Sequence, residues 1–181
     1  LETLKDGEKP RRVVVARESE SLRTVYPVVG GRGRVECLHD SGSQVVSTSK
    51  ARAMELGLSW DPSVVIYMQS ANGQVEKSLG ICRDVPFDFG HMTVYLQVHV
   101  IENPAYDILL GRPFDAVTRC VAHNGRDGSQ TLTLHCPNSD RTIVVPTSER
   151  GKARPVLVPD RASGTDSAKS SAELPKPKEG F

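Results

Sequence analysis

The chain of 181 residues fits a single domain with flanking segments, because a domain typically takes roughly 100–200 residues. Its 23 basic and 22 acidic side chains leave a net charge of +1, which argues against direct nucleic-acid binding through a basic face. No apolar run approaches the roughly 18 residues of a membrane span, so we expect no membrane partner.

Composition divides the chain into three parts. Residues 1–20 are charged without a regular apolar period, and we interpret them as a linker. Residues 21–147 carry the strand and helix patterns of one domain. Residues 148–181 are rich in Ser, Pro, Lys and Glu with few large apolar side chains, which predicts a disordered tail or linker.

The four cysteines lie far apart in strand-like surroundings, and the N-terminus shows no signal-peptide pattern. Cysteines stay reduced in the cytosol. We therefore expect free thiols and an intracellular, cytoplasmic protein. The cysteines are Cys37, Cys82, Cys120 and Cys136.

The first predicted elements lead to a single aspartate. Strand-like residues 22–29 and 34–39 flank a glycine-rich turn, which predicts a β-hairpin. The second strand ends at Asp40, and the chain breaks at the next residues, Ser41, Gly42 and Ser43. Glycine permits a sharp turn there, and serine can hydrogen-bond within it. The sequence thus predicts a carboxylate held at a strand end, although Asp-Ser-Gly alone is an ordinary turn.

A helix and a second hairpin are expected next. Residues 47–49 can cap a helix over 50–56, which Gly57 can end. Strand-like arms at 64–68 and 74–79 then flank a turn that contains Asn-Gly, the strongest short hairpin signal.

The remaining elements are mostly strands. In the strand predicted over 93–100, alternation places four aliphatic side chains on one face: Val94, Leu96, Val98 and Val100. An apolar strand over 107–110 ends at Gly111, and 113–116 can form one helical turn. Further strands are expected at 85–89, 117–123, 131–135 and 142–146. The pattern predicts an all-β fold with one or two short helices.

Two motifs together resemble those of retropepsin-like aspartic peptidases. A strand leads into Asp-Ser-Gly at Asp40, and an apolar strand ends at Gly111, 71 residues later. More narrowly, residues 40–44 (DSGSQ) with 107–114 (DILLGRPF) are similar to the protease segment of gypsy-type LTR-retrotransposon polyproteins. The resemblance covers roughly residues 22–147.

The resemblance implies a closed β-barrel with a flap hairpin and a homodimeric active site. The chain has a single Asp-Ser-Gly, so the catalytic pair would join Asp40 of two chains related by a twofold axis. The implied activity is an aspartic endopeptidase that cuts its own retrotransposon polyprotein and uses no cofactor. A flap at Ala71, Asn72 and Gly73 would close over the substrate peptide.

The resemblance also implies supporting roles around the loop. Ser41 would bond across the dimer axis, and Gly42 would leave room for the substrate backbone. Gly111 would let its strand pass close behind the loop. Arg112 matches an arginine that often pairs with an acid in this family, but Gln44 stands at the acid's position here.

After Gln44, His39 is a second departure from the family pattern, because the residue before the catalytic Asp is usually apolar in this family. Strand alternation places His39 opposite Asp40, and we interpret it as a buried residue rather than a catalytic base. Both departures favour an alternative function, a non-catalytic retropepsin-like module that dimerises or binds peptides. An RNA-binding role is disfavoured by the charge balance.

No metal site is predicted. The pairs Cys120-x-x-His123 and His135-Cys136 could offer four ligands. However, positions three apart or adjacent on a strand point to opposite faces, and no Cys-x-x-Cys occurs.

Overall fold

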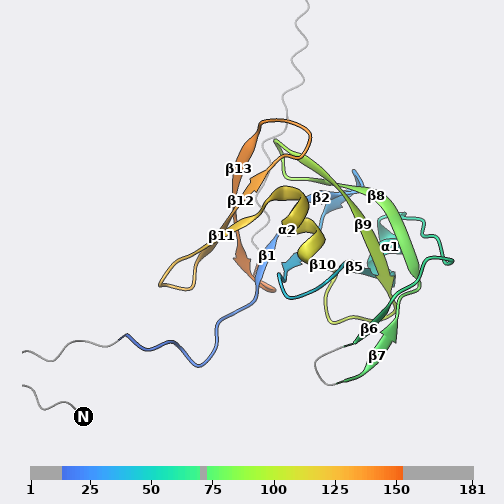
Figure 1. Ribbon diagram of the computed structural model, residues 1–181, viewed down its shortest axis with the longest axis horizontal. Helices are drawn as coiled ribbons and strands as arrows, with labels where there is room; N and C mark the ends of the chain where they lie inside the picture. The colour runs from blue at the N-terminus through green and yellow to red at the C-terminus, as the bar shows by residue number, and fades with distance from the viewer. Residues whose placement is uncertain (1–13, 70–72, 153–181) are drawn as a thin grey trace, which may run out of the picture.

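The computed structural model of the protein describes residues 14–69 and 73–152, which form a mostly-β structure with two short helices (Figure 1). The main sheet consists of β1 (Arg23–Val25), β2 (Val28–Val29), β3 (Gly33–Arg34), β4 (Cys37–His39), β5 (Val46–Ser49), β8 (Gly80–Asp88), β9 (Thr93–Ile101), β10 (Ile108–Leu110) and β14 (Ser148–Glu149). A second sheet consists of β11 (Val121–Asn124), β12 (Gln130–His135) and β13 (Thr142–Pro146). A separate hairpin consists of β6 (Tyr67–Gln69) and β7 (Val75–Lys77), and the helices are α1 (Lys50–Glu55) and α2 (Arg112–Thr118).

The main sheet is a curled half-barrel rather than the closed barrel that was predicted. Its strand order is β14-β1-β4-β10-β5-β9-β8-β2-β3, and the two edge strands do not pair with each other. The mostly-β class with two short helices agrees with the prediction.

The long hairpin of β8 and β9 lies at the centre of the hydrophobic core. In β9 the four predicted aliphatic side chains are all buried, as the alternating sequence requires. Strand β8 adds Phe87, which is fully buried. Burial of an aromatic side chain of this size contributes about 1.5–3 kcal/mol.

Strand β10 lies between β4 and β5. It runs parallel to β4 and antiparallel to β5, and all three of its residues are buried. The connection from β4 to β5 begins at Asp40 and passes the end of β10. The position of β10 therefore fixes the loop that carries the aspartate.

The N-terminal hairpin predicted over residues 22–39 is divided between two parts of the main sheet. Strands β2 and β3 pair around Gly30 and Gly31, which both have positive φ. Strand β1 instead pairs with β4. The strand that leads to Asp40 is thus held between β1 and β10.

Helix α1 matches its prediction to within one residue at its end. The Ser49 side chain accepts a hydrogen bond from the backbone N–H of Arg52 (3.1 Å) and caps the N-terminus. After the helix the chain turns at Gly57 with φ +63°, a left-handed conformation that favours glycine.

Helix α2 is longer than the single turn predicted at 113–116. Phe114 and Thr118 are buried four residues apart, and the Thr118 hydroxyl donates to the Phe114 carbonyl (2.8 Å). The strand predicted from residue 117 is therefore wrong at its start, because Val117 is helical and β11 begins at Val121. β-branched residues favour strands, but burial of the inner helix face outweighs that preference here.

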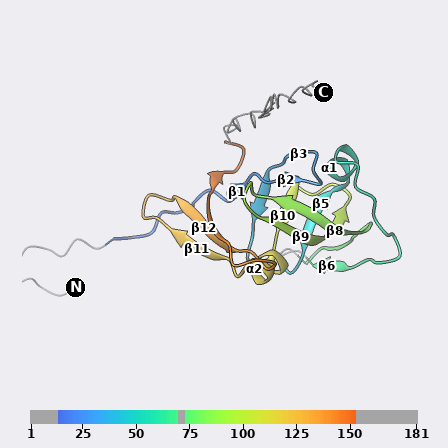
Figure 2. The same ribbon diagram turned by 90° about the horizontal axis from the view of Figure 1, so that it is seen from above.

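The second sheet packs beside the main sheet, with α2 between them in both views (Figures 1 and 2). Its central strand contributes the fully buried Leu132 and Leu134 to the same core. Phe114 of α2 lies in this core and contacts Phe89, with ring centroids 5.9 Å apart.

The C-terminal end of the folded part lies beyond the predicted boundary. The tail was predicted to start at Ser148, but β14 pairs there with β1. The Arg150 N–H donates to the Leu22 carbonyl (3.0 Å), and the Gly151 N–H donates to the Glu36 carboxylate (2.9 Å). That start of the tail is therefore wrong: main-chain pairing on an edge strand needs no apolar side chains, so composition did not reveal it.

Other predictions concern the ends and the cysteines. Residues 14–20 are exposed and form neither helix nor strand, while 1–13 and 153–181 lie outside the described residues. All four cysteines are free thiols. Neither helix in the described part of the chain is long and apolar enough to cross a membrane.

Candidate active site

The loop after β4 holds Asp40 through three hydrogen bonds. The Asp40 N–H donates to the Leu110 carbonyl at the end of β10 (3.0 Å), and the Asp40 carbonyl accepts from the Ser43 N–H (3.1 Å). The Gly42 N–H donates to Oδ1 of the Asp40 carboxylate (2.9 Å). Both the backbone and the side chain of the aspartate are therefore oriented by main-chain groups, and the aspartate lies at a strand end as predicted.

Gly111 lets the chain after β10 pass directly behind this loop. A Cβ on Gly111 would lie 2.2 Å from the Val45 carbonyl oxygen and 2.6 Å from the Ser43 carbonyl oxygen. Contacts that short cannot be accommodated, so only glycine fits. The predicted close approach of the two segments is confirmed.

The loop is accessible from outside. Ser41 and Gly42 are exposed, and Asp40 is half-buried. Beside them a cavity of about 320 Å³ is lined by Asp40, Ser41 and side chains from α2, β11 and β12. The carboxylate therefore lies at the boundary between the interior and the surface, where another molecule can reach it.

Two further predicted residues support the loop through local bonds. The Ser43 hydroxyl donates to the Val45 carbonyl (3.2 Å). Arg112 contributes its backbone N–H, which donates to the Ser43 carbonyl (2.8 Å), whereas its side chain is exposed. Among the described residues no ion pair involves Arg112, and Gln44 is also exposed.

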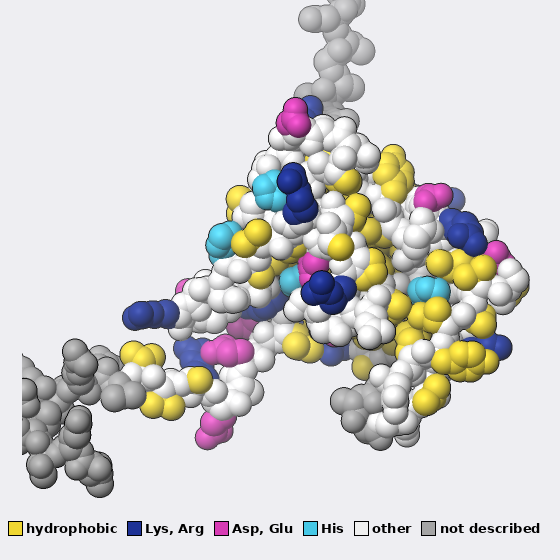
Figure 3. All heavy atoms as spheres, viewed as in Figure 1, with side chains coloured by type: hydrophobic (Ala, Val, Ile, Leu, Met, Phe, Trp, Pro, Cys, Tyr) yellow, Lys and Arg dark blue, Asp and Glu magenta, His cyan; other side chains and the backbone are white. Residues whose placement is uncertain are grey.

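The β6–β7 hairpin confirms the hairpin predicted over 64–79. Tyr67 and Val75 are 71% and 62% exposed, and Figure 3 shows hydrophobic side chains gathered over this part of the molecule. Gly73 has φ +83°, as a tight turn requires. The other two predicted flap residues, Ala71 and Asn72, lie outside the described residues.

Tyr106 is a site residue that sequence reasoning missed. Its hydroxyl shares a 2.8 Å hydrogen bond with Ser47. Burial raises the pKa of Tyr106, the Ser47 bond opposes this, and the negative charges of Glu76 on β7 and of Asp40 raise it further. The phenol therefore lies within electrostatic reach of both the hairpin and the aspartate. The one sequence feature that could have indicated Tyr106 is its position directly before the 107–114 motif.

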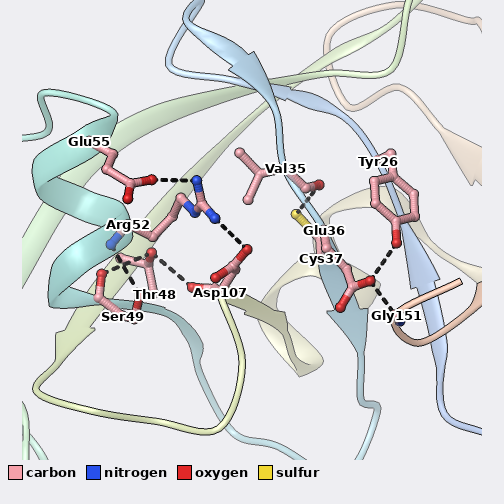
Figure 4. A network of polar contacts seen from close by, with 10 residues as sticks. All are labelled: Tyr26, Val35, Glu36, Cys37, Thr48, Ser49, Arg52, Glu55, Asp107 and Gly151. Atoms are coloured by element: carbon pink, nitrogen blue, oxygen red, sulfur yellow. Dashed lines mark hydrogen bonds and ion pairs between the residues drawn. The ribbon is translucent and has the colours of Figure 1, made fainter. Parts of the chain in front are cut away.

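Asp107 ties the start of β10 to helix α1. Its carboxylate pairs with Arg52 (2.7 Å), which also pairs with Glu55 (2.5 Å), as Figure 4 shows. Its carbonyl accepts hydrogen bonds from the Ser49 N–H (2.9 Å) and the Thr48 hydroxyl (3.1 Å). These bonds position β10, and β10 in turn positions the Asp40 loop.

His39 points inward, as predicted, but toward a carboxylate. Its side chain is 8% exposed, and Nε2 lies 2.8 Å from Oδ1 of Asp115 on α2. Cys120 also bonds Asp115, and burial, then the charge of Asp115, then this bond raise the pKa of the thiol to about 12. His39, Asp115 and Cys120 line the same cavity as Asp40, and within residues 14–69 and 73–152 they form a group of side chains that could hold a metal.

Comparison with sequence families identifies the class of this domain. Residues 25–114 match the family described as aspartyl protease, a range that includes both the Asp40 loop and Gly111. This part of the chain is therefore an aspartyl protease-like domain. No curated protein sequence matches the chain.

Comparison with solved structures finds a similar fold. The chain is similar to the retroviral protease-like domain of Ddi1 from Leishmania major, with a TM-score of 0.57 and 18% identity over 75% of this chain and 100% of that chain. It also matches a retropepsin-like aspartic protease from Rickettsia conorii, with a TM-score of 0.39 and 13% identity over 70% of this chain and 86% of that chain. At these identities the first likeness shows a shared retropepsin-like fold.

Proposed function

We propose that this domain is an aspartic endopeptidase whose active site combines Asp40 of two chains. The observation that carries the proposal is the Asp40 loop. Its carboxylate accepts the Gly42 N–H, its backbone is fixed on β10, and a glycine is required behind it. The Gly42 bond spans two residues and also occurs in ordinary surface turns, but such a turn would need neither the bond from Asp40 to Leu110 nor the close approach of Gly111.

The chemistry requires two carboxylates about 3 Å apart that share one proton. The charged one takes a proton from water, and the water attacks the scissile carbonyl. The neutral one donates a hydrogen bond to the carbonyl oxygen. A twofold axis beside the exposed Ser41 would bring two Asp40 side chains face to face, with the serine hydroxyls bonding across the axis.

The substrate of this proposal is a peptide segment of the protein's own retrotransposon polyprotein. The β6–β7 hairpin would serve as the flap, because its exposed Tyr67 and Val75 offer apolar contact surface for a peptide. Apart from this peptide and a second copy of the chain, the proposal needs no partner or cofactor.

One observation favours the alternative, a non-catalytic module that dimerises or binds peptides. The exposed Arg112 makes no ion pair among the described residues, since Gln44 replaces the acid suggested by the resemblance. The loop could then keep its fold without supporting the chemistry.

The deciding experiment incubates the full chain with a flanking polyprotein fragment. Wild type and the control Asp140→Asn, which changes an exposed aspartate, should cut the fragment, whereas Asp40→Asn should not. Excess Asp40→Asn mixed with wild type should lower activity by forming mixed dimers, and excess Asp140→Asn should not. Equal fragmentation by all three proteins would exclude the peptidase.

A further inference from the structure

Three side chains from two distant parts of the sequence meet beside the Asp40 loop. His39 ends β4, Asp115 lies on α2, and Cys120 follows that helix. One potential ligand atom of each, imidazole nitrogen, carboxylate oxygen or thiol sulfur, lies within 4.8 Å of the other two.

The end of helix α2 brings the cysteine back toward the aspartate. Arg119 adopts a left-handed conformation (φ +45°), and the Cys120 N–H donates to the Asp115 carbonyl (2.9 Å). This helix-ending turn reverses the chain, so Cys120 returns beside the residue five positions before it. The edge of the His39 ring packs on Phe114 (centroids 6.3 Å apart, planes at 75°), which orients the imidazole toward the same point.

A second observation comes from the wall of the same cavity. Gln130 lines it, and the Oε1 of this side chain is buried and accepts no hydrogen bond from the residues that the structure describes. Its Nε2 is already committed to Asn124 (2.8 Å), which fixes the orientation of the amide. The wall of the cavity therefore contains a buried acceptor that lacks a donor among the described residues.

We propose that His39, Asp115 and Cys120 form a zinc-binding site with one open coordination position toward the cavity. Nitrogen, carboxylate oxygen and thiolate are the donor types that Zn²⁺ binds in proteins, and three protein ligands leave a fourth position for water. Tetrahedral Zn²⁺ places its ligand atoms roughly 3.2–3.8 Å apart, so the cluster needs only small side-chain adjustments. On binding, the Cys120 thiol gives its proton to solvent. The metal ion then replaces the hydrogen bonds that His39 and Cys120 make with Asp115 in its absence.

The site was not visible in the sequence because its members are not in a metal-binding spacing. His39 and Asp115 are 76 residues apart, and neither belongs to the two pairs considered from sequence. The proposal does not depend on peptidase activity, because Asp40 is not one of the ligands.

The test titrates the metal-free full-length chain with Co²⁺ and Zn²⁺. Wild type should bind one metal per chain and show the thiolate-to-cobalt charge-transfer band. Cys120→Ser should lose that band, and His39→Gln and Asp115→Asn should weaken zinc binding at least tenfold. The matched control Cys136→Ser, at the turn after β12, and Asp40→Asn should both bind as wild type.

Two outcomes would overturn the proposal: no metal bound by wild type at micromolar concentration, or a charge-transfer band that persists in Cys120→Ser. A mapped alkylation experiment covers the case in which a variant does not fold. At an alkaline pH where Cys120 of the metal-free wild type is alkylated, Zn²⁺ should protect Cys120 while Cys136 stays reactive, and equal alkylation of Cys120 with and without zinc would also exclude the site.

Discussion

Two antiparallel hairpins follow each other along the chain and are stabilised in different ways. In β8–β9, alternate side chains of β9 from Val94 to Val100 are buried in the core, and Phe87 of β8 is completely enclosed. In β6–β7, all three residues of β7 are exposed, and Met68 alone is partly buried on β6. Both hairpins are antiparallel pairs, and it is β8–β9 that carries a register shift between Cys82 and Val85, so the regularity of pairing does not explain the difference in burial.

The exposed hairpin is anchored at its base by one serine. Ser78 is 2% exposed, its N–H donates to the Ile66 carbonyl (2.9 Å), and its hydroxyl accepts from the Ile66 N–H (3.0 Å). Beyond this anchor the hairpin buries little apolar surface and should open at low cost in free energy. The molecule thus combines a well-packed part, which carries Asp40, with an exposed hairpin that is held mainly at its base.

Truncation of a large side chain should lower the free energy of unfolding far more in β8–β9 than in β6–β7, and this is the largest difference expected. Phe87→Ala removes a fully buried ring and should lower the free energy of unfolding by about 3–5 kcal/mol. Tyr67→Ala, at a position 71% exposed, should change it by no more than about 0.5 kcal/mol. Urea denaturation measures both values. Similar losses would show that the β6–β7 hairpin packs as tightly as the core.

Replacement of a glycine by alanine should give the next largest difference in stability between the two hairpins. At Gly80, where the chain enters β8, a Cβ would lie 2.4 Å from the Asp61 carbonyl oxygen, and φ is +150°. Gly80→Ala should therefore cost about 2–3 kcal/mol. At Gly73 nothing lies within 4 Å of the added carbon, so Gly73→Ala should cost only the strain of positive φ, about 1 kcal/mol. Thermal unfolding compares the two, and a reversed order would contradict this account.

Removal of the anchor should act on one hairpin only. Ser78→Ala leaves the Ile66 N–H without its acceptor, at a cost of about 1 kcal/mol. Amide hydrogen exchange should accelerate in β6 and β7 while β8 and β9 keep their protection. The control Ser139→Ala, at an exposed turn, should change neither. Uniform acceleration would mean that both hairpins unfold as one unit.

Acidification should weaken the core hairpin through His99 of β9. Burial lowers the pKa of His99, and a backbone hydrogen bond with Gly80 partly opposes this. Below the unfolded value of about 6.5, the unfolded chain binds a proton that the folded chain resists, so stability is full above that pH and falls below it. This should be the smallest of the four effects.

Melting temperatures of wild type and His99→Gln, measured from about pH 5 to 8, test this sign. The variant should lose less stability in acid. The exposed control His91→Gln should follow wild type. Parallel curves for wild type and His99→Gln would show that His99 does not contribute.

Predictions from sequence succeeded where a residue type leaves few geometries open. Gly111 had to be glycine for close approach, Ser49 is a preferred helix cap, and the alternation in β9 had one buried face. The predictions failed where main-chain pairing or tertiary packing determines the secondary structure of a residue. Strand β14 pairs through its main chain, and Val117 is helical because its neighbours Phe114 and Thr118 are buried.

At the candidate site, the sequence predicted the aspartate and the two glycines but not their side-chain surroundings. The partner of His39 could not be foreseen, since Asp115 lies 76 residues away on a helix whose packing against β4 no local pattern indicates. The bond between Ser47 and Tyr106 likewise joins residues with no common pattern. Such contacts depend on the tertiary arrangement, which local periodicity does not encode.

The insertion of β10 between β4 and β5 also sets the order of events during synthesis. His39 pairs with Leu110, so about 70 residues must leave the ribosome after the aspartate before its loop can be completed. Closing so long a loop carries an entropic cost, and contacts of this range form late in folding. A nascent chain therefore displays Asp40 for some time without the backbone acceptor of Leu110. For the proposed peptidase, this means that the Asp40 loop is incomplete until β10 has been made, and that truncation before residue 108 would abolish the proposed activity although Asp40 is present.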